Sequence, residues 1–510
     1  MGAVVREVEI KYEPAGDEEV PDLGALPGIA SVVEAETQEL DATYFDTENL
    51  ALGKAGLTLR RRVGGSDAGW HLKVPSPDGG RSELREPLGG AQADEVPESL
   101  TGAALLYTRG RSLGAVARLR TRRRTSRLCD DAGRTVAVFS DDLVTADTAV
   151  PPGQARTSTW REWEVELVDG DESVLEAVGE LLEATGARPA SSPSKLARAL
   201  GDLVPTTTDV DDEPGPQSSA GEVVGVRLRR LLAEIKYRDP LVRRDVPDAV
   251  HRMRVAIRRL RSALASYRPV LDRDRTDPLR DELRWIAGVL GDARDAEVMN
   301  ERLTDLVAEE PTELVLGPVA QRVDHHFGAA YRLAHQRAVE AMQSPRYYAL
   351  IDGLDAALEG HPWTNRAQLP AADVLPGRVA KEFKRLRRRV AAVNGAPDSR
   401  TRDARLHEVR KAAKRARYAA EPLVPVLGRD AQRFAKATKK LQSVLGDYHD
   451  AVVTQPALRQ LAVQAHLDGD NAFTYGRLHG RQQALAADLR TGFHDAWARA
   501  SAKKRRRWLP

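Results

Sequence analysis

A chain of 510 residues is too long for one hydrophobic core, so the sequence predicts at least two domains. Its 42% hydrophobic and 30% charged residues are typical of a soluble globular protein, and no apolar run approaches the roughly 20 residues needed to cross a bilayer. The single cysteine, Cys129, excludes an intramolecular disulfide and a cysteine-based zinc cluster. Because the charged N-terminus lacks an apolar signal core, we expect a cytoplasmic protein with no membrane partner.

The first predicted element is a strand over residues 5–11. Side chains alternate between the faces of a strand, so Glu7, Glu9 and Lys11 share one face while Val8 and Ile10 share the other. Two carboxylates about 7 Å apart can share a divalent cation, and the ammonium group can meet a phosphate oxygen. The alternative is an edge strand with a charged outer face.

Later strands repeat this pattern of charges at alternate positions. Residues 57–63 and 69–74 predict a hairpin, residues 118–122 carry three alternate arginines, and residues 160–167 are rich in acids. Many short strands separated by turns predict an antiparallel sheet curled into a barrel, with a helix over residues 172–185 covering apolar side chains. A charged barrel interior must be wet and open-ended, because burying unpaired ions costs on the order of several kcal/mol each.

These charged positions together resemble the CYTH family. The E-x-E-x-K motif at residues 7–11, the arginine-rich strands, Lys73, the pair Glu164 and Glu166, and Lys195 after Ser194 follow the family's order over residues 3–202. The family includes inorganic triphosphatases, thiamine triphosphatases and class IV adenylate cyclases. The resemblance implies an eight-stranded antiparallel tunnel with flanking helices and a Mg²⁺ or Mn²⁺ ion.

The resemblance also divides the charged residues between two tasks. Acidic residues would hold the metal: Glu7, Glu9, Glu164 and Glu166, joined by Asp141 or Asp142. Basic residues would clamp phosphate oxygens: Lys11, Arg60, Arg62, Lys73, Arg85, Arg120, Arg122 and Lys195. Thr58 departs from the family, since many relatives carry arginine there. Glu162 shares a face with Glu164 and is either an extra ligand or a charge at the rim.

The second half of the chain is predicted to be helical and duplicated. After a linker rich in proline, threonine and acids over residues 203–221, residues 251–261 return as 407–417, and residues 290–295 return as 445–450. The sequence therefore predicts an α+β two-domain chain: domain 1–202, linker 203–221, an all-α duplicated bundle over 222–500 and a basic tail over 501–510. Such a tail is typically disordered. The LGDxxD elements, with Asp292, Asp295, Asp447 and Asp450, are interpreted as helix ends and caps.

The repeated helices carry unbalanced positive charge. Residues 227–261 hold 12 Lys and Arg against 4 Asp and Glu, and residues 378–417 hold 15 against 4. Like charges four residues apart repel on a helix, so such stripes favour a polyanionic partner over a merely soluble face.

The H-x-x-R-x-x-x-[RK] helices and the LGDxxD elements resemble the CHAD family, whose members bind inorganic polyphosphate. By that resemblance the polyanion-binding residues are His251, Arg254, Arg258, Arg261, His407, Arg410, Lys411, Lys414 and Arg417. The basic residues Lys381, Lys384, Arg385 and Arg388 would extend this surface.

The sequence thus predicts a CYTH-CHAD protein of the inorganic triphosphatase type. We expect metal-dependent hydrolysis of inorganic triphosphate or a related short polyphosphate by direct attack of water. The helical domain is expected to bind polyphosphate, which would bring the protein to polyphosphate granules in the cytoplasm. The alternatives are a non-catalytic protein that binds polyphosphate granules, and an adenylate cyclase using the same tunnel. Nucleic acid is not the expected partner, because 5% aromatic residues provide few stacking platforms.

Overall fold

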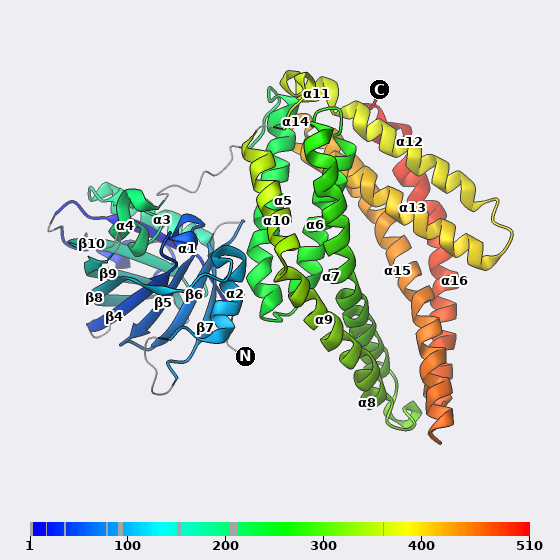
Figure 1. The fold of residues 1–510 in the computed structure, drawn as a ribbon, viewed down its shortest axis with the longest axis horizontal. Helices are drawn as coiled ribbons and strands as arrows, with labels where there is room; N and C mark the ends of the chain where they lie inside the picture. The colour runs from blue at the N-terminus through cyan, green and yellow to red at the C-terminus, as the bar shows by residue number, and fades with distance from the viewer. Residues whose placement is uncertain are drawn as a thin grey trace. The chain divides into compact units, whose positions relative to one another are not determined.

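The computed structural model describes residues 4–16, 18–34, 37–77, 80–89, 95–149, 155–204, 213–360 and 362–510, without the side chains of residues 4–7. The chain folds as two compact units, a sheet unit and a helical unit (Figure 1). Residues 205–212 of the predicted linker lie outside the described residues. None of the described helices combines the length and apolar character needed to cross a membrane.

The sheet unit is built on one antiparallel sheet of 11 strands. The strands are β1 Val4–Glu7, β2 Glu9–Glu13, β3 Ser31–Glu34, β4 Gln38–Asp46, β5 Thr58–Val63, β6 Gly69–Pro75, β7 Arg81–Glu86, β8 Gly114–Cys129, β9 Thr135–Thr148, β10 Arg156–Leu167 and β11 Arg188–Pro189. Their hydrogen-bonded order is β1-β7-β6-β5-β4-β8-β9-β10-β2-β11, and β3 pairs with β8 outside this path.

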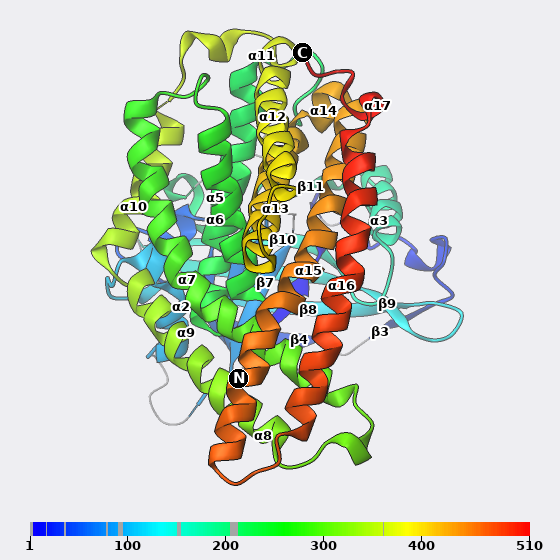
Figure 2. The same ribbon diagram turned by 90° about the vertical axis from the view of Figure 1, so that its right-hand side faces the viewer.

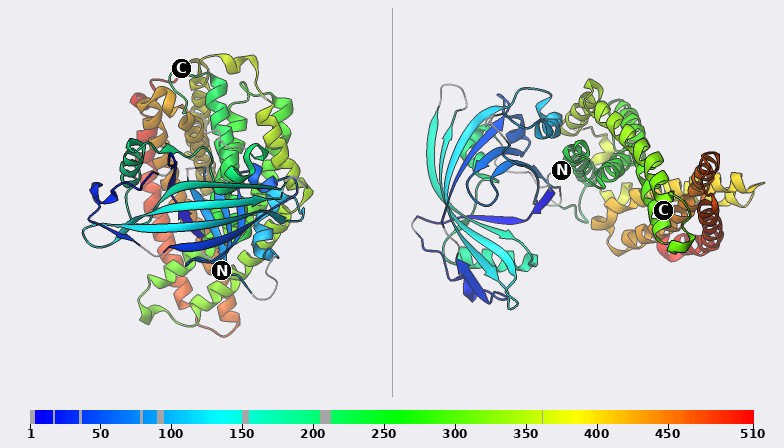
Figure 3. Two further views of the ribbon diagram at one scale, coloured as in Figure 1. Left: turned by 90° about the vertical axis from the view of Figure 1, so that its left-hand side faces the viewer. Right: turned by 90° about the horizontal axis from the view of Figure 1, so that it is seen from below.

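The sheet closes because β1 and β2 lie near opposite ends of this path but are separated in the chain only by Val8. The strand predicted over residues 5–11 is therefore two strands: Glu7 lies opposite Arg81 of β7, and Glu9 lies opposite Glu166 of β10. The sheet curls back on itself as the barrel prediction required (Figure 3). The predicted number of eight strands is corrected, because β1 and β2 form separately and the short β3 and β11 are added.

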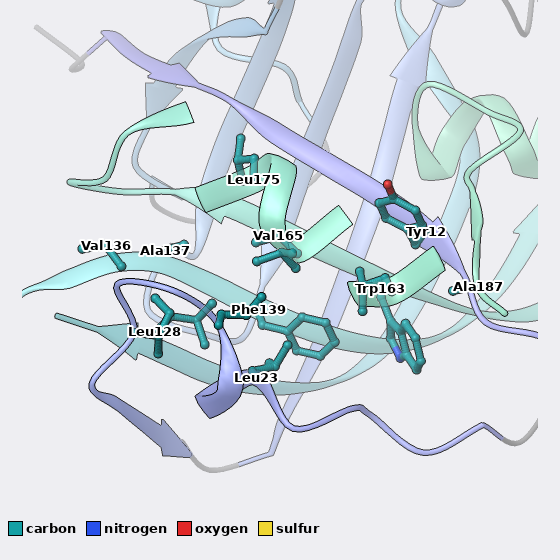
Figure 4. Close-up of a cluster of buried hydrophobic side chains, with 14 residues drawn as sticks. Tyr12, Leu23, Leu128, Val136, Ala137, Phe139, Trp163, Val165, Leu175 and Ala187 are labelled. Atoms are coloured by element: carbon teal, nitrogen blue, oxygen red, sulfur yellow. The ribbon is translucent and has the colours of Figure 1, made fainter. Parts of the chain in front are cut away.

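Alternation along β9 and β10 separates apolar from acidic side chains. Phe139, Trp163 and Val165 point outward, where they pack with Leu175 of α3, Glu172–Ala184 (Figure 4). The intervening positions of both strands, including Glu164, therefore point into the barrel. The other helices of this unit are α1 Ala51–Lys54, α2 Glu98–Thr108 and α4 Lys195–Leu200, with 3₁₀ turns at Leu23–Ala25 and Gly201–Leu203.

Helix α4 fills part of the barrel interior. Its Leu196 and Leu200 cluster with inward residues of β8, β9 and β10, among them Leu119, Val144 and Trp160. Lys195, the first residue of α4, stands where this apolar region meets the charged one. The prediction of an open-ended interior is therefore wrong on this side, because apolar side chains close it.

The helical unit consists of long helices and short connections. The helices are α5 Ala220–Arg243, α6 Ala249–Ser266, α7 Arg273–Ala308, α8 Val319–Val323, the π-helix η4 Asp324–Gly328, α9 Ala329–Met342, α10 Pro345–Glu359, α11 Ala371–Val374, α12 Pro376–Val393, α13 Ser399–Ala420, α14 Val424–Leu427, α15 Arg429–Leu467, α16 Phe473–Ser501 and α17 Lys503–Arg506. Three further 3₁₀ turns lie at Thr312–Leu314, Asn365–Gln368 and η6 Glu421–Leu423. The repeat places α6 and α7 in correspondence with α13 and α15, and α13 packs beside α6, α12 and α15 (Figure 2).

The LGDxxD elements do not end helices, and that interpretation is wrong. Gly291 lies inside α7 and Gly446 inside α15. A Cβ atom at Gly291 would lie 3.3 Å from the guanidinium of Arg254, and one at Gly446 would lie 3.4 Å from that of Arg410. In each copy the two repeated motifs therefore contact each other, and the glycine of α7 or α15 leaves room for the arginine of α6 or α13.

The basic tail is ordered rather than disordered. Residues 503–506 form α17, and the Trp508 ring packs edge-on against Phe434 with 5.9 Å between centroids. The Arg506 guanidinium lies 5.7 Å from the centroid of Phe383. Aromatic contacts to α12 and α15 thus hold a segment that composition alone assigned to solvent.

Candidate active site and basic groove

The barrel interior holds a cavity of about 100 Å³, which we call the tunnel cavity. Its lining combines acidic and basic side chains from β2, β5, β6, β7, β8 and β10. The lining residues are Glu9, Lys11, Leu40, Ala42, Tyr44, Thr58, Arg60, Arg62, Asp67, Lys73, Arg81, Arg85, Leu119, Thr121, Arg123, Glu164, Glu166, Ser194 and Lys195. The cavity is small because opposite charges pair across it, so an anionic ligand must exchange those pairs for its own.

Three carboxylates form an acidic cluster beside the cavity. Oxygens of Asp142, Glu162 and Glu164 lie within 4.8 Å of one another. The ammonium nitrogen of Lys195 stands among them, 2.9 Å from Asp142, 2.6 Å from Glu162 and 2.7 Å from Glu164. Within the described residues, the cluster thus offers the oxygen donors of a cation site, and the ammonium group of Lys195 lies among these oxygens.

Lys11 and Arg123 complete the neutralisation of this cluster. Lys11 pairs with Glu164 and lies 3.1 Å from Glu9, while Arg123 reaches Asp142 at 2.6 Å and Glu164 at 2.7 Å. Burial opposes ionisation of Glu164, but these cations and Lys195 outweigh it and hold the pKa of Glu164 well below its usual range. Glu164 is therefore ionised at neutral pH and suited to a hard cation.

The opposite wall of the barrel, formed by β5, β6 and β7, is basic and is organised by Glu83. This buried carboxylate pairs with Arg85 and lies 3.9 Å from Arg60 and 3.8 Å from Lys73. It also contacts His71 Nδ1 at 2.9 Å. Glu83 thereby holds three phosphate-binding candidates in one place while leaving an excess of positive charge.

Arg62 belongs to the same wall. It pairs with Asp67, yet burial together with the nearby Arg60 and Arg123 lowers the pKa of Arg62 to about 9. A neighbouring anion would relieve this repulsion. Tyr44 faces the same space, with its hydroxyl 3.5 Å from Arg60 Nη1.

The structure places many of the predicted residues together. The predicted residues that line the tunnel cavity are Glu9, Lys11, Arg60, Arg62, Lys73, Arg85, Glu164, Glu166 and Lys195. Thr58 lines it too, at the position where relatives often carry arginine. The side chain of Glu7 lies outside the described residues.

Three predicted residues face the wrong way. Arg120 and Arg122 are 57% and 66% exposed on the outer face, where they lie near Asp147 and Glu39. Asp141 also points away from the interior, binding Arg161 at 2.7 Å and accepting a hydrogen bond from Trp163 Nε1. Each prediction is one residue out of register, because neighbouring positions of a strand face opposite sides.

Arg123, which was not predicted, faces the interior in place of Arg120 and Arg122. Of the two alternatives Asp141 and Asp142, it is Asp142 that faces inward, and Glu162 joins it in the acidic cluster. The R-x-R-x-R pattern of β8 marks its solvent face, whereas Leu119 and Thr121, the intervening residues, point inward with Arg123. The less polar residues between the alternate arginines of β8 were the sequence feature that could have identified its inward face. Arg81 and Tyr44 were also missed, although Arg81 continues the alternation of Glu83 and Arg85.

This register gives a matched pair of variants. We expect Arg123→Met to lower triphosphate turnover by about 10²-fold, because it removes a buried guanidinium from the charged interior. Arg120→Met should remain within about twofold of the native rate, since exposed ion pairs contribute little. Steady-state phosphate release from both proteins checks this, and equal losses would contradict the inward assignment of Arg123.

The helical unit contains a cavity of about 900 Å³ between α6, α7, α12 and α13, which we call the basic groove. Basic residues from all four helices line it, with Glu382 as an acidic member. The lining residues are Arg258, Arg261, Ser262, Ala265, Arg268, Pro269, Arg273, Arg280, Arg284, Arg378, Lys381, Glu382, Arg385, Lys411, Lys414, Arg415 and Tyr418. Arginines contributed by α7 and Arg378 were not predicted, because they lie outside the repeated stripes.

Several predicted polyanion-binding residues lie outside this groove. They are His251, Arg254, Lys384, Arg388, His407, Arg410 and Arg417. Lys384 and Arg388 are exposed on α12, whereas Arg254 and Arg410 pack on the glycines described above. Burial and the neighbouring His449 and Lys411 lower the pKa of His407 to about 4, so this histidine is neutral at physiological pH.

Lys414 is a buried residue that lines the groove. Burial and the guanidinium groups of Arg258, Arg410, Arg417 and Arg254 lower the pKa of Lys414 to about 7. No carboxylate among the described residues lies within ion-pair distance of it. This uncompensated charge is the electrostatic property expected of a site for an anion.

A closed antiparallel barrel with a charged interior, followed by a duplicated helical bundle with a basic groove, defines a two-module class of protein. The sequence profile of the CYTH domain matches residues 5–200, and that of the CHAD domain matches residues 226–459. The chain belongs to the family of proteins in which a CYTH domain precedes a CHAD domain. CYTH domains are metal-dependent, and their family comprises triphosphatases and cyclases.

Known proteins are similar to nearly the whole chain or to about half of it. An uncharacterized protein of Mycobacterium tuberculosis strain H37Rv, Rv2226, is 36% identical over 499 residues, covering 95% of this chain and 94% of its own. PptA from Streptomyces chartreusis shares 24% identity, covering 55% of this chain and 99% of its own, with a TM-score of 0.45. The CHAD domain from the plant Ricinus communis shares 26% identity, covering 57% and 95%, with a TM-score of 0.44.

Proposed function

We propose that this protein hydrolyses inorganic triphosphate, or a related short polyphosphate, in the tunnel cavity with the help of Mg²⁺ or Mn²⁺, and that the helical unit binds inorganic polyphosphate. The observation that carries the catalytic part is the opposition of charges across one cavity. An acidic cluster on β9 and β10 faces a basic wall on β5, β6 and β7. A cation and a phosphate chain can therefore sit side by side between them.

The donor set fits a hard divalent cation. Asp142, Glu162 and Glu164 offer three carboxylate oxygens, the donors that Mg²⁺ and Mn²⁺ prefer. The position of Lys195 among them supports this assignment, because the same oxygens already surround a positive charge. A bound cation would supply Lewis acidity toward a phosphate oxygen.

The side chains of this chain would do the remaining work by neutralising charge. Phosphoryl transfer to water spreads negative charge over the oxygens of the transferred group and the leaving group. Arg60, Arg62 and Lys73 lie on the basic wall and would meet these oxygens in exchange for their contacts with Glu83 and Asp67. Lys11 and Arg123 extend the positive charge to the acidic side, so the substrate would be held from both sides.

The helical unit would bind polyphosphate through the positive charge of its arginines and the length of its lysine side chains. The basic groove combines arginines, which bind phosphate oxygens in a bidentate manner, with the flexible ammonium groups of Lys381 and Lys411. Since these contacts are electrostatic and mostly solvent-accessible, binding should weaken with added salt.

A substrate panel tests the proposal. Purified full-length protein with Mg²⁺ or Mn²⁺ would be assayed against triphosphate, ATP, thiamine triphosphate and long polyphosphate. Phosphate release that is fastest from triphosphate supports it. Cyclic AMP and pyrophosphate from ATP would instead identify a cyclase, and polyphosphate binding without turnover of any substrate would identify a binding protein.

Polyphosphate binding should depend on pH through Lys414. Without ligand, Lys414 is half protonated near pH 7, and a bound polyanion favours its charged form. Affinity should therefore rise by up to about tenfold per unit as pH falls toward 7 and level off below it, with uptake of a proton on binding. Calorimetry in buffers of different ionisation enthalpy checks this with long chains, whose terminal phosphates contribute little. A Lys414→Arg variant should lose the dependence.

A further inference from the structure

The basic groove has a counterpart in the other copy of the repeat. A shift of 156 residues superimposes the buried positions of α6 on those of α13, so that Met253 corresponds to Val409 and Leu260 to Ala416. The same shift makes Arg261 equivalent to Arg417, Arg415 equivalent to Arg259, and Ala265 equivalent to Glu421. The two copies thus share these arginines, and they differ in charge at the position of Ala265 and Glu421.

In the groove, the position equivalent to Glu421 is the uncharged residue Ala265. Ala265 lines the cavity one helical turn after Arg261. Burial, followed by the neighbouring Arg258 and Arg284, lowers the pKa of Arg261. Arg261 therefore faces the cavity among cations, with no acidic side chain on the next turn of its own helix.

In the counterpart, an acidic side chain occupies that position. The carboxylate of Glu421, in η6 directly after α13, lies 2.9 Å from Arg417 Nε and 3.4 Å from Arg227 Nη2 of α5. Arg259 and Arg417 gather on the ring of Tyr418, at 5.4 and 4.9 Å from its centroid. Arginines from α5 and α13 thus meet on one carboxylate, and Arg259 of α6 lies beside them on the Tyr418 ring.

We infer that Glu421 is a built-in anion that occupies a second, repeat-related phosphate site, so that the duplicated bundle presents one open polyanion site instead of two. This inference rests on the proposed polyphosphate binding and identifies the residue that selects the site. A carboxylate held by two guanidinium groups makes the contacts that a phosphate group would make there. In the groove Ala265 leaves the equivalent contacts to a ligand.

Exchanging the two residues tests the inference. Glu421→Gln removes the internal anion with little change of shape, and Ala265→Glu places a carboxylate four residues after Arg261, as Glu421 follows Arg417. Binding of one defined-length inorganic polyphosphate to the full chain would be measured by calorimetry in EDTA. The matched controls are Glu359→Gln and Ala487→Glu, which change charge equally at exposed positions of α10 and α16.

We expect Glu421→Gln to gain one binding site per chain. Ala265→Glu should lower the affinity of the native site by about tenfold or more, as expected for occupied charge-assisted contacts. The double variant should keep the native number of sites, and the controls should bind like the native protein. Ala265→Glu keeps the test decisive even if Glu421→Gln does not fold.

Two results would overturn different claims. The role of Glu421 would be overturned if the native protein binds polyphosphate and Glu421→Gln has the same number of sites. It would also be overturned if Ala265→Glu binds polyphosphate as tightly as Ala487→Glu. Absence of polyphosphate binding by the native protein would overturn the proposed function of the helical unit itself.

Discussion

Glu164→Gln should lower the rate of triphosphate hydrolysis by about 10²-fold or more. Glu164 is the carboxylate shared by Lys11, Lys195 and Arg123, so the substitution removes the negative charge on which the acidic cluster depends. It also weakens any cation site formed with Asp142. Phosphate release at saturating Mg²⁺ or Mn²⁺ measures the loss, and a raised metal requirement should accompany it.

Loss of fold must be separated from loss of chemistry in this variant. Removing one member of a buried ion network leaves uncompensated cations and costs about 3–5 kcal/mol of stability. Thermal unfolding of the sheet unit and retained polyphosphate binding by the helical unit serve as controls. A folded Glu164→Gln protein with native turnover would contradict the assignment of the acidic cluster to catalysis.

Arg258→Glu combined with Lys414→Glu should weaken polyphosphate binding by about 100-fold or more at physiological salt. Both residues line the basic groove, and Lys414 is buried there without a carboxylate partner among the described residues. Reversing them removes two contacts and adds repulsion. Triphosphate hydrolysis in the tunnel cavity should remain close to the native rate.

The matched control is Lys384→Glu combined with Arg388→Glu. These residues carry the same charge and lie on α12, but they are exposed and outside the groove. They should weaken binding several-fold less than the groove pair at equal ionic strength. Equal losses from both pairs would show that net charge, and not the groove, determines binding.

The sequence was sufficient for the closed sheet and for most of its charged interior. Lys73, Glu164 and Lys195 could be predicted because family order fixes them independently of local register. Arg120, Arg122 and Asp141 could not be placed correctly from alternation alone, since a charged face is compatible with solvent as well as with a wet interior. Only the pairing of β8 with β9, which sets Arg123 opposite Asp142, distinguishes the two.

In the helical unit, the sequence revealed the repeat but not what its motifs contact. Local rules predict that Gly291 and Gly446 end helices, yet each lies inside a helix, where the guanidinium of an arginine from another helix packs against it. The Trp508 contact that orders the basic tail is likewise tertiary. The asymmetry between Ala265 and Glu421 is visible in the sequence, but its meaning depends on the approach of Arg227 from α5.

The most direct test of the central claim is phosphate release from inorganic triphosphate by the full-length protein, stripped with EDTA and then titrated with Mg²⁺ or Mn²⁺. The account predicts no turnover without added metal and a rate that rises to saturation as either ion is restored. Turnover that persists unchanged in EDTA, or no turnover at any concentration of either metal, would contradict it.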